Sequence, residues 1–283
     1  MGEHPPRPRW RPGVHVVRRD ADHLQAGIDP PHRVILPDRP GVRAALRELP
    51  ALSAAEPEAR VALHALRTAG LLLEGGEPGS ASAVSPEARR AAESQFGEDA
   101  GRRLAARSRT RVGVRAEHGL HATALGMVRA AGLSLAESGA PPDLWLVVTA
   151  GEPDRAEVDP LLREGAAHLL VSAGPSARVG PFVVPGRTAC LRCVDAHLAE
   201  TDPRRPLVVE QVVRAARATG GPPVDPTLAV LALAWAVRDL CRYAEEDRPE
   251  TWSAVVEVGP AGPPVRRDWA RHPHCGCAWD VLA

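Results

Sequence analysis

The sequence predicts an α/β protein built from two parts, and three observations support this. The chain of 283 residues is long enough for two domains of ordinary size. A segment rich in glycine, serine and proline, residues 76–85, interrupts the patterned regions. Strand-like runs followed by helical ones precede this segment, whereas strand and helix patterns alternate after it. We therefore expect one domain over residues 1–75 and another over residues 86–283, joined by a linker at 76–85.

The first part begins with three short β-prone runs, separated by a polar turn and by prolines: residues 13–18, 23–27 and 33–36. Apolar residues then recur at helical spacing in two segments, one over Val42 to Leu49 and one that begins near Pro57. Proline suits the first turn of a helix, where its missing N–H is not needed. Three strands followed by helices in so short a segment predict a winged-helix-like module.

The second part opens with an alanine- and arginine-rich helix expected over residues 86–108, with Ser85 as its cap. We expect this helix to pack outside the sheet that follows. That sheet should be largely parallel, because strand and helix patterns alternate: strand 111–115, helix 121–131, strand 144–149, helix 158–165 and strand 168–172. Further on, we expect a strand-like run at 180–185, an apolar helix at 226–243 and a strand at 251–258. We assign the apolar helix to the core, with a dimer interface as the alternative.

Charge and hydropathy exclude several classes of function. The 35 basic and 35 acidic side chains cancel, so the basic surface of a nucleic-acid binder is missing. Every one of the cations is an arginine, and a chain without lysine has neither a Schiff-base lysine nor a Walker-type phosphate-binding lysine. No apolar run is long enough to cross a bilayer. We expect a soluble, cytoplasmic protein with no nucleic-acid or membrane partner.

Four of the five cysteines form two close pairs, Cys190 with Cys193 and Cys275 with Cys277. In a reducing compartment such pairs favour a metal over disulfides, and four thiolates are the ligand set of a closed structural zinc site. The one-residue gap of the second pair is tighter than the usual spacing, so a histidine from residues 272–274 could replace one sulfur. The alternatives are four ordinary buried side chains or a redox pair. A bound ion would tie the C-terminal tail to the middle of the domain.

The turn after the first strand of the second part lacks the glycines of a dinucleotide-binding loop. Only Gly119 lies near the bend, so a close approach of the backbone to phosphate is mostly lost. We interpret this turn as a degraded nucleotide site and expect that ATP does not bind. The alternative is that Arg115 or His118 holds a phosphate by its side chain, with Glu137 as the candidate for a ribose. The polar residues 195–202 are interpreted as a solvated surface rather than an acid/base cluster.

The first part also contains a possible site for an extended peptide. If residues 33–36 form an exposed sheet edge, a peptide could add to the sheet through main-chain hydrogen bonds. The neighbouring helix carries Arg60, His64 and Arg67, whose side chains could select the partner. The simpler alternative for any one of these charges is a solvated face.

Taken together, these segments resemble two known families. Residues 8–73 resemble the PqqD-like domain, also called the RiPP recognition element. The segment that ends in Cys190-Leu-Arg-Cys193, together with His272-Pro-His-Cys-Gly-Cys277, resembles the zinc-binding part of the Rossmann-type ThiF-like adenylating fold. In this order the parts are similar to the Ocin-ThiF-like, or cyclodehydratase C-type, proteins of azoline-forming (TOMM) peptide biosynthesis.

This resemblance implies a non-catalytic scaffold that presents a ribosomal precursor peptide to a separate YcaO-type enzyme. Val34, Ile35, Leu36, His64 and Arg67 would hold the leader of that precursor. The alternatives are an ATP-dependent adenylating enzyme and a zinc-stabilised interaction module with another partner. ThiF-like folds commonly pair, so a homodimer is also possible.

Overall fold

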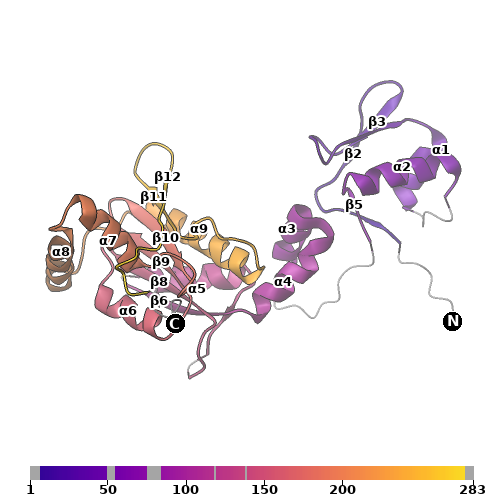
Figure 1. Cartoon of the computed structure of the whole chain (residues 1–283). Coiled ribbons are helices and arrows are strands. Elements are labelled where there is room, and N and C mark those ends of the chain that lie inside the picture. The colour runs from indigo at the N-terminus through magenta and orange to yellow at the C-terminus, as the bar shows by residue number, and fades with distance from the viewer. Residues whose placement is uncertain (1–6, 50–54, 75–83, 118, 138, 278–283) are drawn as a thin grey trace. The chain divides into compact units, whose positions relative to one another are not determined.

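The computed structural model describes residues 7–49, 55–74, 84–117, 119–137 and 139–277, and these form two compact units (Figure 1). The first unit is Met1–Leu104 and the second is Ala105–Ala283. The boundary falls inside helix α4, Ala100–Arg109.

The N-terminal unit contains a three-stranded antiparallel sheet in the order β2-β3-β4. Its strands are β2 (Val16–Arg18), β3 (His23–Ala26) and β4 (Val34–Pro37). A second, two-stranded pairing joins β1 (Arg9–Trp10) to β5 (Leu72–Leu73). Helices α1 (Pro40–Glu48) and α2 (Pro57–Thr68) pack against each other, and their buried leucines form one core with Ala26 and Leu36 of the sheet. The expected order of three strands and two helices is therefore present.

Helix α3 (Pro86–Phe96) belongs to this first unit, because the buried Arg11 holds it there. The guanidinium of Arg11 donates to the carbonyl oxygens of Ser94 and Gln95, both at 3.0 Å, and to that of Gly70 at 3.1 Å. The last carbonyls of a helix have no partner within the helix, so these bonds cap the end of α3. This differs from the single helix expected over residues 86–108. That segment instead breaks at Gly97, whose φ of 59° suits glycine, before a short 3₁₀ turn and α4.

The C-terminal unit is built on a seven-stranded mixed sheet in the order β12-β11-β10-β9-β8-β6-β7. Its strands are β6 (Arg111–Ala116), β7 (Ser134–Leu135), β8 (Leu144–Ala150), β9 (His168–Ala173), β10 (Ala177–Val183), β11 (Ala254–Val258) and β12 (Val265–Asp268). The strands β7, β6, β8 and β9 run parallel. From β9 onward the pairing is antiparallel, which corrects the expectation of a largely parallel sheet.

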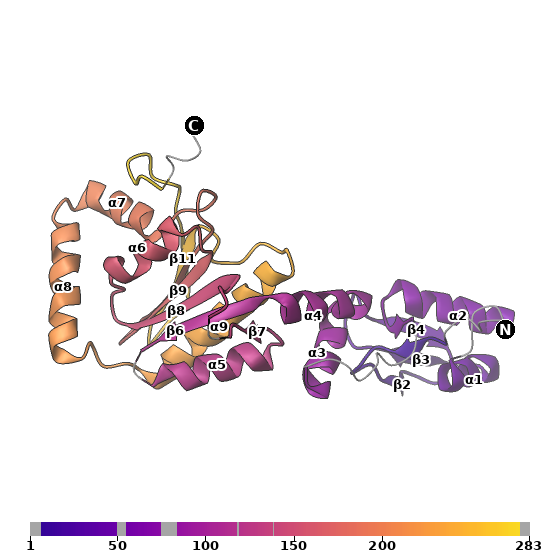
Figure 2. The same ribbon diagram turned by 90° about the horizontal axis from the view of Figure 1, so that it is seen from below.

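Helices cover both faces of this sheet (Figure 2). The helices of the unit are α5 (Leu120–Ala130), α6 (Arg155–Arg163), α7 (Leu191–Thr201), α8 (Arg205–Thr219) and α9 (Pro226–Ala244). One core lies between the sheet and the pair α5 and α9, and a smaller one lies on the opposite face beneath α6 and α7. Leu233 and Leu240 of α9 are fully buried, so this helix serves the core as expected. Among the described residues, no helix is both long and apolar enough to cross a membrane.

Candidate functional site

The four paired cysteines lie together. Cys190 and Cys193 stand at the N-terminal end of α7, and Cys275 and Cys277 come from the C-terminal tail. The Sγ–Sγ distances are 3.7 Å for Cys190–Cys193, 3.4 Å for Cys190–Cys275 and 3.4 Å for Cys193–Cys277. A tetrahedral ion with sulfur ligands at about 2.3 Å would place them about 3.8 Å apart. These separations are far longer than a disulfide bond of about 2.05 Å, and they are compatible with a metal site.

The hydrogen bonds within the cluster favour the ionised form at one sulfur, that of Cys193, whereas the pKa values of Cys190 and Cys275 are raised. The pKa of Cys193 is lowered because the thiols of Cys190 and Cys275 donate hydrogen bonds to its sulfur, and the main-chain N–H of His272 adds another. The thiolate is the form of cysteine that binds metals. Cys190 and Cys193 are buried, in a small apolar cluster that also includes Val183.

Two histidines near the cluster, His197 and His272, contact groups other than the sulfurs. Nδ1 of His272 accepts a hydrogen bond from the main-chain N–H of His274 at 3.1 Å, so its proton is on Nε2, which lies 3.0 Å from a carboxylate oxygen of Glu200. The ring of His272 therefore joins the tail to α7 and does not replace a sulfur. His197 packs its ring edge-on against that of His272 and contacts the Ala270 carbonyl oxygen. The polar stretch behind the first cysteine pair thus supports the tail.

The position for a nucleotide in such a sheet is the carboxyl edge, where the strand order reverses between β6 and β8. Here Glu117 follows β6, and its carboxylate accepts from the main-chain N–H of Ala150 at 3.3 Å. The pocket at this edge is lined by four carboxylates and one arginine: Glu117, Glu152, Asp154, Glu157 and Arg217. Arg217 forms ion pairs with Asp154 and Glu157, and Glu152 pairs with Arg155 and Arg178. Among the residues that line this pocket, no unpaired cation is therefore left to hold a phosphate.

Of the side chains considered for phosphate or ribose, Arg115 lies at this edge, where it lines a second pocket together with Glu117 and His121. The guanidinium of Arg115 lies 4.1 Å from the ring centre of Trp145, in a cation–π contact. Strand β7 pairs only with the first two residues of β6, so Glu137 follows it well before the carboxyl end of β6. His118 lies outside the described residues.

Within the described residues of the N-terminal unit, β4 is an edge strand that pairs only with β3, and α2 contacts it. The main-chain N–H of Asp38 donates to the carbonyl oxygen of Asp22 at 2.7 Å, in register with the β3–β4 ladder. Hydrogen-bonded pairs alternate along an antiparallel ladder, so Val34 and Leu36 bond to β3. The main-chain N–H and C=O of Ile35 therefore face the open edge.

The side chains expected to contact a peptide differ in their exposure to solvent. The side chain of Ile35 is 43% exposed, whereas that of Leu36 is 4% exposed and belongs to the core, so Leu36 cannot offer its side chain to a peptide. Val34 is half-buried against the same core. On α2, Arg60 and His64 are exposed, one turn apart. Arg67 continues that stripe and forms an ion pair with Glu74.

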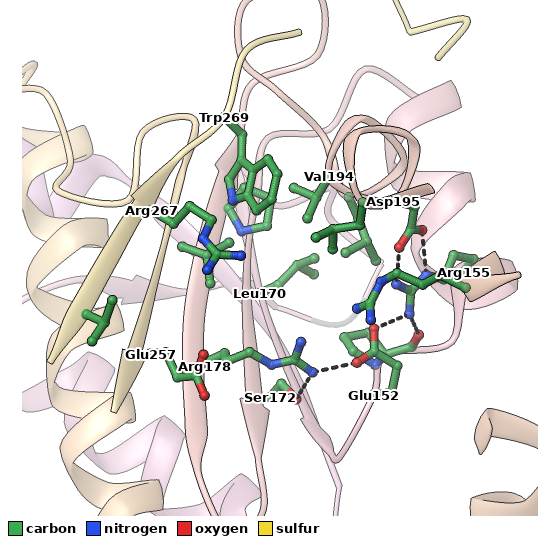
Figure 3. A pocket seen from close by; sticks show the side chains of 18 residues that line it. Glu152, Arg155, Leu170, Ser172, Arg178, Val194, Asp195, Glu257, Arg267 and Trp269 are labelled. Carbon is green, nitrogen blue, oxygen red and sulfur yellow. Dashed lines mark hydrogen bonds and ion pairs between the residues drawn. The ribbon is translucent and has the colours of Figure 1, made fainter. Parts of the chain in front are cut away.

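An ion-pair network that the sequence did not reveal joins α6, α7 and β10 (Figure 3). Arg155 donates two hydrogen bonds to Asp195, at 2.6 and 2.9 Å, and also contacts Glu152 at 2.6 Å. Glu152 in turn pairs with Arg178. Burial alone would raise the pKa of Glu152, but the charges of Arg178 and Arg155 outweigh it and lower that pKa. Glu152 and Arg155 are three residues apart, but the contacts of Arg155 with Asp195 and of Arg178 with Glu152 span 40 and 26 residues, so no local motif signals the network.

Solved structures with a fold similar to that of this chain include two heterocyclases and MccB. No protein-family model matches the chain, and no curated protein matches it. Among solved structures the chain is similar to the heterocyclase TruD, with 18% identity and a TM-score of 0.68 over 98% of this chain and 43% of TruD. A heterocyclase solved with substrate and cofactor gives 17% identity and a TM-score of 0.65, covering 98% of this chain and 40% of that one.

The chain is also similar to MccB of E. coli, solved with ATP, with 10% identity and a TM-score of 0.61. This match covers 96% of the chain and 99% of MccB. The chain thus spans less than half of each heterocyclase and nearly all of MccB. At these identities the likeness shows a shared fold.

Proposed function

We propose that this chain is a non-catalytic scaffold that binds the leader of a ribosomally made precursor peptide and presents it to a YcaO-type cyclodehydratase. The observation that carries the proposal is the open edge of β4. Ile35 offers one N–H and one C=O there, which is what an added peptide strand needs. The exposed Arg60 and His64 of α2, the helix that contacts β4, supply side chains for selecting the peptide.

The structural neighbours support a peptide as the partner. One is a heterocyclase solved with its substrate, and MccB, a microcin C7 biosynthetic enzyme, was solved in complex with N-formylated MccA. The heterocyclases extend well beyond the region that this chain matches. We therefore assign the cyclising chemistry to a partner enzyme and peptide binding to this chain.

The carboxyl edge of the large sheet supports a role without adenylation. An adenylating enzyme must hold a nucleotide triphosphate, and four carboxylates line the pocket where that nucleotide would lie. We assign zinc to the four cysteines, because four sulfur ligands leave no open position for water or substrate. In this role the ion stabilises the fold and takes no part in chemistry.

The test uses the full-length, metal-loaded chain and synthetic peptides for the short open reading frames that flank its gene. Hydrogen exchange is followed with and without each peptide. A bound leader should slow exchange of the Ile35 amide, whereas the Leu36 amide, already bonded to β3, should change little. Binding that leaves the Ile35 amide unprotected would contradict the proposal. Pyrophosphate exchange with Mg-ATP by the chain alone would favour the adenylating alternative instead.

A further inference from the structure

A pocket of about 240 Å³ lies in the C-terminal unit, on the sheet face that α7 covers (Figure 3). Strands β9 to β12 form one wall, and α7 forms the other. Part of the lining is apolar and consists of Leu170, Leu191, Val194 and Leu198. Such a mixture of apolar wall and a few polar groups is typical of small-ligand sites.

The ion-pair network supplies a rigid, neutral side of this pocket. The carboxylates of Glu152 and Asp195 are matched by the guanidinium groups of Arg155 and Arg178. Arg178 uses Nη2 for Glu152 and for the Ser172 hydroxyl, at 3.4 Å. In the described part of the chain, its Nε and Nη1 have no partner. The network therefore fixes Arg178 in place while leaving donors to spare.

The remaining charges leave the pocket with an excess of cations. Arg205 and Arg267 also line it, and the acid left outside the network is the exposed Glu257. Among the described residues, neither arginine has an ion-pair partner, and Arg267 lies 5.7 Å from the ring centre of Trp269. Figure 3 shows the guanidinium groups of Arg178 and Arg267 turned toward the same space. Two like charges that converge on one cavity repel each other unless an anion lies between them.

We propose that this pocket binds a small organic carboxylate attached to an apolar group. Arg178 and Arg267 would hold the carboxylate, and the leucines and Val194 would contact the apolar group. The pocket is lined by four arginines and three carboxylates, so its excess of one positive charge matches a singly charged carboxylate better than a doubly charged anion such as phosphate. The carboxylate can come from a free small molecule or from the C-terminus of a peptide, since both present the same chemistry. This inference does not depend on leader binding in the N-terminal unit.

The test is a calorimetric titration of the full-length, metal-loaded chain with N-acetyl-leucine and, as the uncharged match, N-acetyl-leucine amide. The acid should bind and the amide should bind roughly tenfold more weakly or not at all. Arg267→Gln is the main variant, because Arg267 is exposed on β12 and its loss leaves the core intact. It should weaken binding of the acid by roughly tenfold. Arg129→Gln on α5 is the control, since Arg129 is exposed and lies outside the pocket.

Three results would overturn the proposal, and one further comparison identifies the source of the carboxylate. Equal binding of acid and amide, or no effect of Arg267→Gln, would overturn the proposal. Binding of inorganic phosphate in preference to the acid would also overturn it. If the acid binds, comparison with an acetylated tripeptide ending in leucine identifies the source: tighter binding of the tripeptide points to a peptide C-terminus, and weaker binding points to a free small molecule.

Discussion

Replacing one of the four clustered cysteines should lower the stability of the C-terminal unit, because the proposed zinc ion would be lost. An ion held by Cys190, Cys193, Cys275 and Cys277 would join α7 to the tail and close a loop of 85 residues. In the chain-entropy description of cross-links, a loop of this length contributes about 4–5 kcal/mol to the free energy of unfolding. For a unit of this size, that corresponds to a fall in Tm of roughly 10–20 °C. Cys193→Ala is the variant of choice, because Cys193 is fully buried at the cluster.

The assay combines metal analysis with differential scanning calorimetry. The unaltered chain should carry one equivalent of zinc, and Cys193→Ala should lose it and melt earlier. Cys241→Ala is the matched control: its thiol is also buried, which raises its pKa to about 11, but it belongs to the core beneath α9 and not to the cluster. That variant should keep its zinc. Full zinc content in Cys193→Ala, or a Tm within a few degrees of the original, would contradict a stabilising metal ion at this cluster.

Three further predictions concern stability, each measured by urea unfolding of the full chain. Arg11→Ala should lower the free energy of unfolding of the N-terminal unit by about 3–5 kcal/mol, because it leaves the end carbonyls of α3 unpaired; a loss below about 1 kcal/mol would contradict this. Asp239→Asn should cost about 1–3 kcal/mol, because the buried carboxylate accepts hydrogen bonds from the main chain of Glu250 and Thr251, and an equal stability would contradict this. Burial lowers the pKa of His168 below 6.5, so the unfolded chain binds more protons than the folded chain below that pH. The free energy of unfolding should therefore fall as the pH drops through this range. His168→Asn should reduce this dependence of the free energy of unfolding on pH.

The spacing of apolar residues predicted most of the helices and strands, because an element that buries one face repeats its apolar residues at a fixed spacing. The run 168–172 forms the fully buried strand β9, and the apolar residues of 226–243 form the buried face of α9. What the periods could not predict was the direction of β10 to β12. Apolar runs look alike whether a strand is parallel or antiparallel, and the direction depends on connections that carry no periodic signal.

The sequence pattern also could not predict which of the two units contains α3. The linker at 76–85 lies between β5 and α3, yet α3 joins the first unit because Arg9 and Arg11 bind it from the beginning of the chain. These contacts span more than 80 residues of sequence, for example 84 for Arg9 with Glu93. One feature of the sequence indicates the break in this segment. Gly97 lies inside the helix expected over residues 86–108, and the chain changes direction there.

In the candidate sites, some features follow from neighbouring residues in the sequence, whereas others depend on pairing between distant segments. Two cysteines separated by two residues can point both sulfurs at one ion, so their spacing alone indicated a site. The alternation of a strand could have shown that Leu36 faces the core when Ile35 faces out. By contrast, which main-chain groups of β4 face the open edge depends on its register with β3, and that register follows from pairing.

The most direct test of the account is the affinity of the full chain for a leader peptide when the open edge of β4 loses its donor. Ile35→Pro removes the N–H that faces the edge, and proline is tolerated on an edge strand. Ile35→Ala is the control, since it shortens the side chain and keeps the N–H. Ile35→Pro should weaken peptide binding by roughly tenfold or more, while Ile35→Ala should change it much less. Equal affinity of Ile35→Pro and the unaltered chain for the same peptide would show that the peptide does not bind as an added strand.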